Sequence, residues 1–158
     1  MVVKEINYKE TSYFSPLFCD YMNNDPKLKS FYNLYPSIDN FKKQIDQKKS
    51  EYRDKNREIL YDVIKQQYKE INCSNEFNSM LESIKEKNTF TVTTGHQLNL
   101  FTGPIYFLYK ILTTINLCDE LTQKYPKFNF IPVYWMATED HDFKEINHFN
   151  FENSKIEW

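Results

Sequence analysis

The sequence predicts an α/β fold in which helices cover a parallel sheet. Residues 89–94 read TFTVTT, a short run of β-branched and aromatic residues that is typical of a strand. Residues 130–137 read FIPVYWMA and are apolar at nearly every position, as in an inner strand covered on both faces. The segment between them, residues 104–121, has a wide apolar face at helical spacing. A strand, a helix and a strand in this order favour a right-handed crossover and two parallel strands.

The composition favours one globular domain and argues against general nucleic-acid binding. The 158 residues include 41% hydrophobic and 17% aromatic residues, enough for a core. The net charge is −2, and no basic stripe stands out. No apolar run follows the charges at the amino terminus, so no signal peptide is predicted. The most apolar segment, residues 104–121, contains Lys110, Asp119 and Glu120, which favours a buried helix over a membrane span.

The cysteines predict ordinary thiols. Cys19, Cys73 and Cys118 are far apart in the sequence and odd in number, so they form neither a metal-binding spacing nor a disulfide framework. Such usage is typical of a reducing compartment, and a cytoplasmic location is predicted.

The chain is predicted to have an aromatic-rich, helical segment over residues 1–88 and the first part of the sheet domain over residues 89–158. In the first segment, aromatic runs broken by proline favour short helices whose aromatic rings pack on a larger body. Apolar residues at spacings of three, four and seven then predict a helix over residues 37–71, in which residues 48–57 form a solvated charged face. A shorter helix is expected over residues 77–84.

The ends of the crossover helix and of the chain carry further signals. Thr102 or Gly103 is expected to cap the helix, with Pro104 in its first turn. A short helix and the start of another strand are expected after Asp142. The chain then ends with one or two strands fewer than a doubly wound sheet usually has, so the sheet is predicted to be incomplete.

A first polar cluster, Gly95, His96 and Gln97, follows the first predicted strand. The only two glycines of the sequence are Gly95 and Gly103, which predicts backbone positions that cannot carry a side chain. The helix that follows offers free N–H groups, which suit a phosphate. His96 could donate a hydrogen bond to a phosphoryl oxygen or carry a stabilising positive charge. The alternative is that His96 and Gln97 only cap a turn.

A second polar cluster, residues 138–142, follows the second strand. Because parallel strands end at the same edge of a sheet, the two clusters are expected to be neighbours, where such sheets bind ligands. The carboxylates of this second cluster could hold a ribose hydroxyl or a substrate ammonium group. His141 with Asp140, Asp142 or His148 could instead bind a metal. The remaining alternative is a solvated loop with an aspartate that caps a helix.

The motifs of residues 94–110 and 134–148 resemble the bacillithiol biosynthesis cysteine-adding enzymes, the BshC family. The segments that carry the resemblance are TGHQ, LFTGP and YFLYK, followed by YWMATEDHDF and EINH. The resemblance is strongest over residues 89–150. It implies a Rossmann-like core related to class I aminoacyl-tRNA synthetases, with inserted connective segments and a C-terminal coiled coil that forms a homodimer.

The resemblance also implies a function and site residues. The family joins cysteine to glucosaminyl-malate in the last step of bacillithiol synthesis, with cysteine activated by ATP or another nucleotide. No metal site, nucleic acid or membrane is implied. The implied catalytic residues are His96, Gln97, His141 and Asp142. The implied nucleotide-binding residues are Thr94, Gly95, His96 and Gly103, and the implied substrate-binding residues are Asn99, Glu139 and Asp140.

The chain departs from the family in length, because family members are several times longer than a βαβ unit. The sequence is therefore interpreted as an N-terminal fragment of a cysteine ligase. One alternative is a nucleotide-binding or nucleotidyltransferase module of the same fold with another acceptor. Another is a truncated remnant without enzymatic activity.

Overall fold

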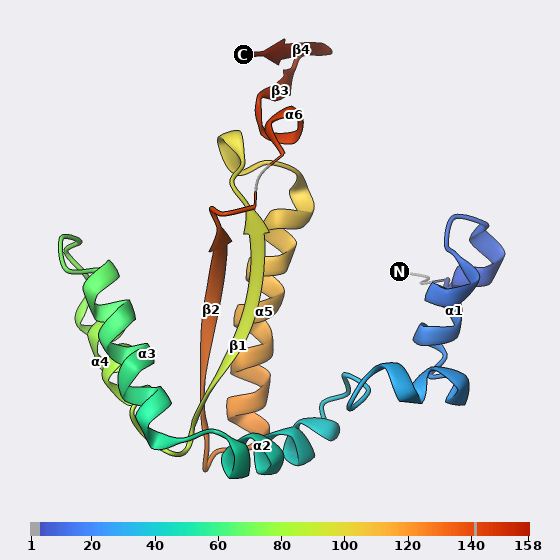
Figure 1. The fold of residues 1–158 in the computed structure, drawn as a ribbon. Helices are drawn as coiled ribbons and strands as arrows, with labels where there is room; N and C mark the ends of the chain where they lie inside the picture. Colours follow the sequence, from blue (N-terminus) through green and yellow to red (C-terminus); the bar gives the residue numbers. More distant parts are fainter. Residues whose placement is uncertain (1–3, 141) are drawn as a thin grey trace. The chain divides into compact units, whose positions relative to one another are not determined.

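The fold is that of a computed structural model, which describes residues 4–140 and 142–158 (Figure 1). The chain divides into two compact units, Met1–Lys48 and Lys49–Trp158. The predicted domain boundary at residue 88 stays a prediction.

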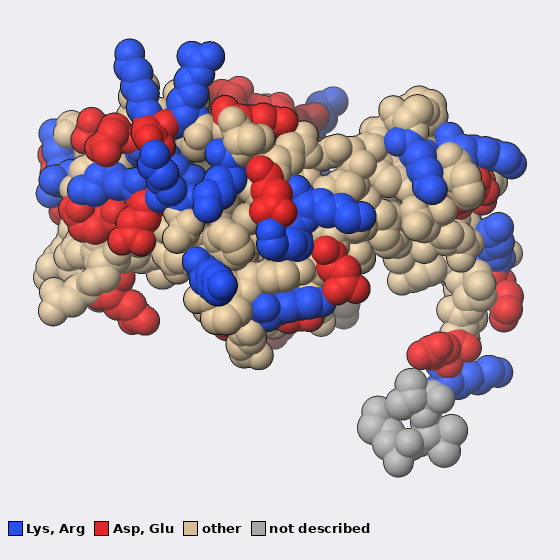
Figure 2. Space-filling model, turned by 90° about the horizontal axis from the view of Figure 1, so that it is seen from below, with Lys and Arg blue, Asp and Glu red and all other residues tan. Residues whose placement is uncertain are grey.

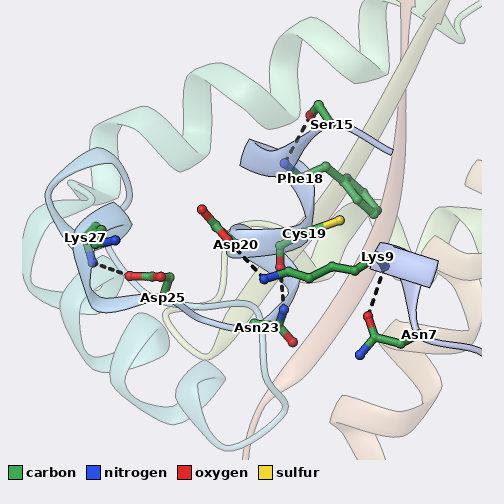
Figure 3. Close-up of polar contacts among 9 residues, drawn as sticks. All are labelled: Asn7, Lys9, Ser15, Phe18, Cys19, Asp20, Asn23, Asp25 and Lys27. Carbon is green, nitrogen blue, oxygen red and sulfur yellow. Dashed lines mark hydrogen bonds and ion pairs between the residues drawn. The ribbon is translucent and has the colours of Figure 1, made fainter. Parts of the chain in front are cut away.

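The first unit contains short helices that are capped by polar side chains. Its elements are η1 (Tyr8–Thr11), α1 (Pro16–Met22), η2 (Pro26–Phe31) and the start of α2 (Asn40–Glu51). Asn7, Ser15 and Asp25 each accept a hydrogen bond from a backbone N–H of the helix that follows (Figure 3). Because side-chain acceptors precede these helices and proline begins α1 and η2, the sequence correctly predicts short helices here.

The aromatic residues of the first unit contact one another. The Tyr8 ring lies edge-on to the rings of Phe14 and Phe18, at centroid distances of 4.8 and 5.3 Å. Tyr21 packs in the same way against Tyr32, at 5.6 Å. Such pairs bury aromatic area within a short segment.

In the second unit, α3 (Asp54–Gln67) and α4 (Asn75–Ser83) precede the sheet. The single helix predicted over residues 37–71 is wrong, because α2 ends at Glu51 and α3 begins at Asp54. Arg53 has extended backbone angles, φ −78° and ψ 145°, which interrupt the helix. Periodicity alone could not reveal the break, since apolar residues continue at helical spacing across it.

Arg57 of α3 is buried, so the prediction of a solvated face over residues 48–57 is wrong at this position. Its Nη1 donates to the carbonyl oxygens of Ile84 and Thr89, at 3.1 and 2.8 Å. Its guanidinium also lies over the rings of Tyr52 and Phe90. The arginine thus joins α3, the end of α4 and the first residue of the sheet.

The sheet of the second unit pairs β1 (Thr89–Gln97) with β2 (Asn129–Ala137). The strands are parallel, as predicted, and their register runs from Thr89↔Asn129 to Gln97↔Ala137. β1 continues beyond its predicted end at Thr94, because Gly95, His96 and Gln97 all pair with β2. The chain therefore forms the predicted α/β architecture with a parallel pair of strands.

Helices pack on the strand pair from two sides. The connecting helix α5 (Ile105–Lys124) packs along both strands (Figure 1). A second core cluster joins the strand residues Ile131 and Val133 to α3 and α4. The helical residues of that cluster are Leu60, Tyr61, Ile64, Phe77, Met80, Leu81 and Ile84.

The helix α5 begins one residue later than predicted, and its cap is different. Pro104 is the N-cap residue and makes no side-chain capping bond, so neither Thr102 nor Gly103 fills that position. Gly103 has φ +60° and ψ −150°, which turns the chain out of the short helix η3 (Leu100–Thr102) and into Pro104. The fixed φ of Pro104 then prepares the helix, and its carbonyl accepts the N–H of Phe107 at 2.9 Å.

After β2, the chain forms α6 (Phe143–Ile146) and a hairpin of β3 (His148–Phe151) and β4 (Ser154–Glu157). The short helix and following strand agree with the sequence-based prediction. Asn147 is buried between them, where its side-chain amide donates to Glu157 Oε1 at 3.0 Å. Two backbone positions with positive φ, Glu152 and Asn153, form the hairpin turn.

Charge is mixed on the face of the molecule drawn in Figure 2, where basic and acidic side chains are interspersed. This distribution agrees with the net charge of −2. Over residues 4–140 and 142–158, no helix has the length and apolar character needed to cross a bilayer.

Candidate functional site

The candidate site lies at the carboxyl end of the β1–β2 pair. His96 is the penultimate residue of β1, is half-buried and pairs with Met136 of β2. Because Gln97 pairs with Ala137, the segments that follow the two strands leave the sheet at the same edge. The prediction that the chain leaves both strands at the same edge is therefore confirmed for the described residues.

The imidazole of His96 is held at both ring nitrogens. Nε2 lies 2.9 Å from the hydroxyl of Tyr106, which belongs to the first turn of α5. Nδ1 lies 2.8 Å from the Asn99 amide nitrogen and 3.1 Å from the carbonyl oxygen of Gln97. The same Asn99 nitrogen donates to the Gln97 carbonyl at 3.0 Å. The ring is thus fixed between the strand end and the helix.

The helix α5 supplies two polar side chains that our sequence reasoning did not assign to the site, Tyr106 and Lys110. Lys110 Nζ donates to the carbonyl oxygen of Gly95 at 3.1 Å and lies 5.6 Å from the centre of the Tyr106 ring. The two residues are four apart, so they share one face of the helix. That spacing, directly after a polar cluster at a strand end, is the signal that could have identified them.

Two aromatic residues contact His96 from the neighbouring elements, Tyr134 of β2 and Phe107 of α5. The Tyr134 hydroxyl donates to the His96 carbonyl oxygen at 3.3 Å. The Phe107 ring contacts the rings of both His96 and Tyr134, at centroid distances of 5.9 and 5.5 Å. Burial raises the pKa of the Tyr134 hydroxyl above its usual range.

Both glycines occupy positions that have no room for a side chain. A Cβ on Gly95 would lie 2.8 Å from the carbonyl oxygen of Trp135 on the neighbouring strand. A Cβ on Gly103 would lie 2.6 Å from Cγ of Asn99. The inference from glycine scarcity is correct, and the groups that exclude the side chain belong to the chain itself. Close approach of a ligand to Gly95 and Gly103 stays a prediction, as does nucleotide binding by Thr94, which lies on β1 opposite Tyr134.

The first turn of α5 keeps its positive dipole end free of acidic side chains. Its first residues, Ile105, Tyr106 and Phe107, are apolar or aromatic. No carboxylate in this turn therefore opposes an anion at the positive end of the helix.

The second polar cluster has a different character. Glu139 and Asp140 are exposed, and Asp142 accepts the N–H of Lys144 at 2.9 Å as the N-cap of α6. Capping of a helix by the aspartate was one of the alternatives predicted from the sequence. His141, predicted to be catalytic, lies outside the described residues. Catalysis by Asp142 and substrate binding by Asn99, Glu139 and Asp140 stay predictions.

The described residues offer no obvious metal site. Among residues 4–140 and 142–158, no group of three His, Cys, Asp or Glu side chains is arranged to hold a metal ion. His148, a candidate in the metal alternative, has its Nδ1 3.1 Å from the side-chain oxygen of Asn147.

Cys118 of α5 is a structural thiol. Burial against the sheet, with a smaller contribution from Asp119, raises its pKa to about 11. Because the thiolate is the reactive form of cysteine, Cys118 is poorly suited to act as a nucleophile.

A parallel strand pair joined by a crossover helix is the basic unit of Rossmann-like α/β domains, which bind ligands at the carboxyl ends of their strands. The family model described as "Bacillithiol biosynthesis BshC, N-terminal Rossmann-like domain" matches residues 1–158. The chain therefore belongs to the BshC family.

Relatives in three bacteria are similar to the chain over nearly all of its length. Those of Flavobacterium psychrophilum and Flavobacterium johnsoniae are each 53% identical over 97% of the chain. The relative in Cytophaga hutchinsonii is 37% identical over 99% of it. All three are named "Putative cysteine ligase BshC". The chain spans only 29 to 30% of the length of these relatives.

Proposed function

We propose that this chain is the N-terminal part of a ligase that joins cysteine to glucosaminyl-malate in bacillithiol biosynthesis. Membership of the BshC family and the names of its relatives support the ligase class and the pathway. The substrates, cysteine activation by ATP or another nucleotide, homodimerisation of the longer protein and a cytoplasmic location are parts of the proposal. They rest on the resemblance to the family.

The observation that carries the proposal is the fixed imidazole of His96 at the carboxyl edge of the sheet, next to the start of α5. The His96–Tyr106 contact is exposed, so a ligand can reach its hydroxyl and ring. Donors fixed before a ligand arrives stabilise developing negative charge without reorganisation. In the proposed reaction, His96 holds the Tyr106 hydroxyl, and this pair directs a hydrogen bond to the phosphoryl group that activates cysteine.

Other residues have supporting roles in this proposal. The helix terminus at α5 attracts the phosphates, which pass over Gly95 and Gly103 next to Thr94. Gln97, His141 and Asp142 act near the reacting group. The exposed carboxylates of Glu139 and Asp140 hold the substrate ammonium group, which they can do by charge.

The test measures ligation by the complete protein that carries this chain, supplied with cysteine, glucosaminyl-malate and ATP. We expect His96→Gln to reduce bacillithiol formation by about 100-fold or more, as removal of a fixed transition-state donor does. Product is measured by chromatography after thiol labelling, and thermal unfolding checks the fold. His148→Gln, the same change in the β3–β4 hairpin, is the control and should keep full activity. Undiminished product with His96→Gln would contradict the proposed role.

Calorimetry separates the proposal from its enzymatic alternative. A cysteine ligase of this kind should bind glucosaminyl-malate as well as an ATP analogue. Binding of the nucleotide without the sugar would favour a nucleotidyltransferase with another acceptor.

A further inference from the structure

The Asn99 side chain sits in a position that restricts the protonation of His96. Nδ1 of the ring has two neighbours with opposite hydrogen-bonding roles. The Gln97 carbonyl oxygen, at 3.1 Å, can only accept a hydrogen bond, whereas the Asn99 amide nitrogen, at 2.8 Å, can only donate one. Nδ1 cannot satisfy both, because a protonated nitrogen donates and an unprotonated nitrogen accepts.

The Gln97 carbonyl decides how the Asn99 amide is oriented. The amide nitrogen is 3.0 Å from that oxygen and donates to it. A flipped amide would place its own oxygen there and bring two acceptors together. The amide nitrogen must therefore also face Nδ1, which accepts through its lone pair. The ring proton of a neutral His96 then lies on Nε2, which donates to the Tyr106 hydroxyl at 2.9 Å.

Gly103 provides the space for this arrangement. A Cβ at Gly103 would lie 2.6 to 2.7 Å from Cγ, Cβ and Oδ1 of Asn99. Any side chain at Gly103 would therefore displace the amide from His96. The glycine turns the chain into α5 and, by having no side chain, leaves the Asn99 side chain in place.

We propose that Asn99, held against Gly103, is a positioning residue that fixes His96 as the neutral tautomer with its proton on Nε2. Because the Tyr106 oxygen accepts a hydrogen bond from the His96 Nε2–H, the hydroxyl hydrogen of Tyr106 points away from the ring. It is then directed to an incoming acceptor such as a phosphoryl or carboxylate oxygen. This role differs from the substrate contact predicted for Asn99 from the resemblance. The tautomer follows from the contacts alone, and its use in catalysis rests on the proposed function.

The tautomer can be observed directly, because the chain has only three histidines. Long-range ¹H–¹⁵N spectra of the ¹⁵N-labelled chain distinguish protonated from unprotonated ring nitrogens, and His96→Gln assigns the signals of His96. The spectra are recorded at about pH 8, above the usual histidine pKa of about 6.5. We expect an unprotonated Nδ1 and a protonated Nε2. A protonated Nδ1 in the unmodified chain would overturn the proposal.

Substitutions at Asn99 test whether its side chain fixes the tautomer of His96. Asn99→Asp keeps the shape but replaces the donor with an acceptor, so the proton should move to Nδ1. Asn99→Ala removes the donor, so Nδ1 should become at least partly protonated and donate to Gln97. Asn56→Asp, at an exposed position of α3, is the matched control and should leave the His96 signals unchanged. Unchanged His96 nitrogens in Asn99→Asp would overturn the proposal.

Gly103→Ala tests the steric part, with circular dichroism as the check of folding. It should alter the His96 signals in the same direction as Asn99→Ala, and it should add nothing to the effect of Asn99→Ala in the double variant. A full additional effect in the double variant would contradict the link between Gly103 and Asn99.

The outcomes separate this inference from the proposed function. If the tautomer is as inferred and His96→Gln still ligates cysteine normally, the proposed function fails alone. If His96 is required for ligation but Nδ1 is protonated, the positioning role of Asn99 fails alone.

Discussion

Polar side chains lie at both ends of β1, but their exposure to solvent differs between the two ends. At the amino end, Thr89 and Arg57 are buried, and the guanidinium satisfies two backbone carbonyl groups. At the carboxyl end, the His96–Tyr106 pair is also hydrogen bonded, yet it is exposed to solvent. Buried polar groups must be bonded for stability, whereas exposed groups can exchange a partner for a ligand. We therefore expect the amino end to serve stability and the carboxyl end to serve the proposed function.

The largest expected loss of stability is at the amino end. Arg57→Ala should lower the free energy of unfolding by about 3 kcal/mol, because the carbonyl groups of Ile84 and Thr89 lose a buried charged donor. Urea denaturation measures the change. Arg53→Ala, at the exposed N-cap of α3, is the matched control and should cost little. Similar losses for both arginines would remove the distinction drawn for Arg57.

A smaller loss of stability is expected near the carboxyl end of β1. Gly95→Ala should cost about 1–3 kcal/mol, because its Cβ would lie 2.8 Å from the Trp135 carbonyl oxygen and the strands would have to separate. Thermal unfolding measures the effect, with Thr91→Ala at an exposed position of β1 as the control. A Gly95→Ala chain as stable as the unmodified one would show that the strands can separate at this end without cost.

At the carboxyl end, activity should respond more than stability. Tyr106→Phe removes the hydroxyl that would donate to the ligand, but it also frees the His96 Nε2–H to donate in its place. The net loss should therefore be limited to about 1.4 kcal/mol of transition-state stabilisation, or about a tenfold lower ligation rate. Tyr109→Phe, at an exposed position of the same helix, should leave the rate unchanged. Equal rates for the two variants would argue against a role for the Tyr106 hydroxyl.

The smallest expected effect depends on pH and lies away from both ends. Hydrogen bonds from Lys85 and Tyr61 lower the pKa of Glu82. The carboxylate therefore adds stability above its unfolded pKa and loses that contribution as the pH falls through its lower folded pKa. The stability difference between the unmodified chain and Glu82→Gln should be small at pH 7, vanish in acid and shrink in high salt. Glu120→Gln on α5 is the control, and a difference that grew in acid would contradict the assignment.

The sequence was sufficient for the features that depend on local pattern and chain order. Strand, helix and strand signals predicted the parallel pair, and the shared edge followed from the direction of the strands. The scarcity of glycine predicted two crowded positions, but the crowding groups, Trp135 and Asn99, come from tertiary packing and could not be inferred.

Other features depend on distant contacts. The burial of Arg57 depends on carbonyl groups 27 and 32 residues away, so its charge alone suggested a solvated position. The break at Arg53 depends on backbone angles that the apolar periodicity does not encode. The sequence placed Tyr106 and Lys110 only in a family motif. Their contacts with His96 and Gly95 depend on where α5 begins, which the sequence did not predict.

The close packing of Trp135 on Gly95 also gives the protein an intrinsic optical probe. The indole Cδ1 lies 3.4 Å from where a Cβ of Gly95 would be, and the Trp135 side chain is 59% exposed at the edge that carries His96. The sequence has only one other tryptophan, Trp158, so Trp158→Phe leaves a single tryptophan, which can be excited selectively at wavelengths where tyrosine does not absorb. The fluorescence of that chain should then report the arrival of a ligand at the sheet edge without any added label.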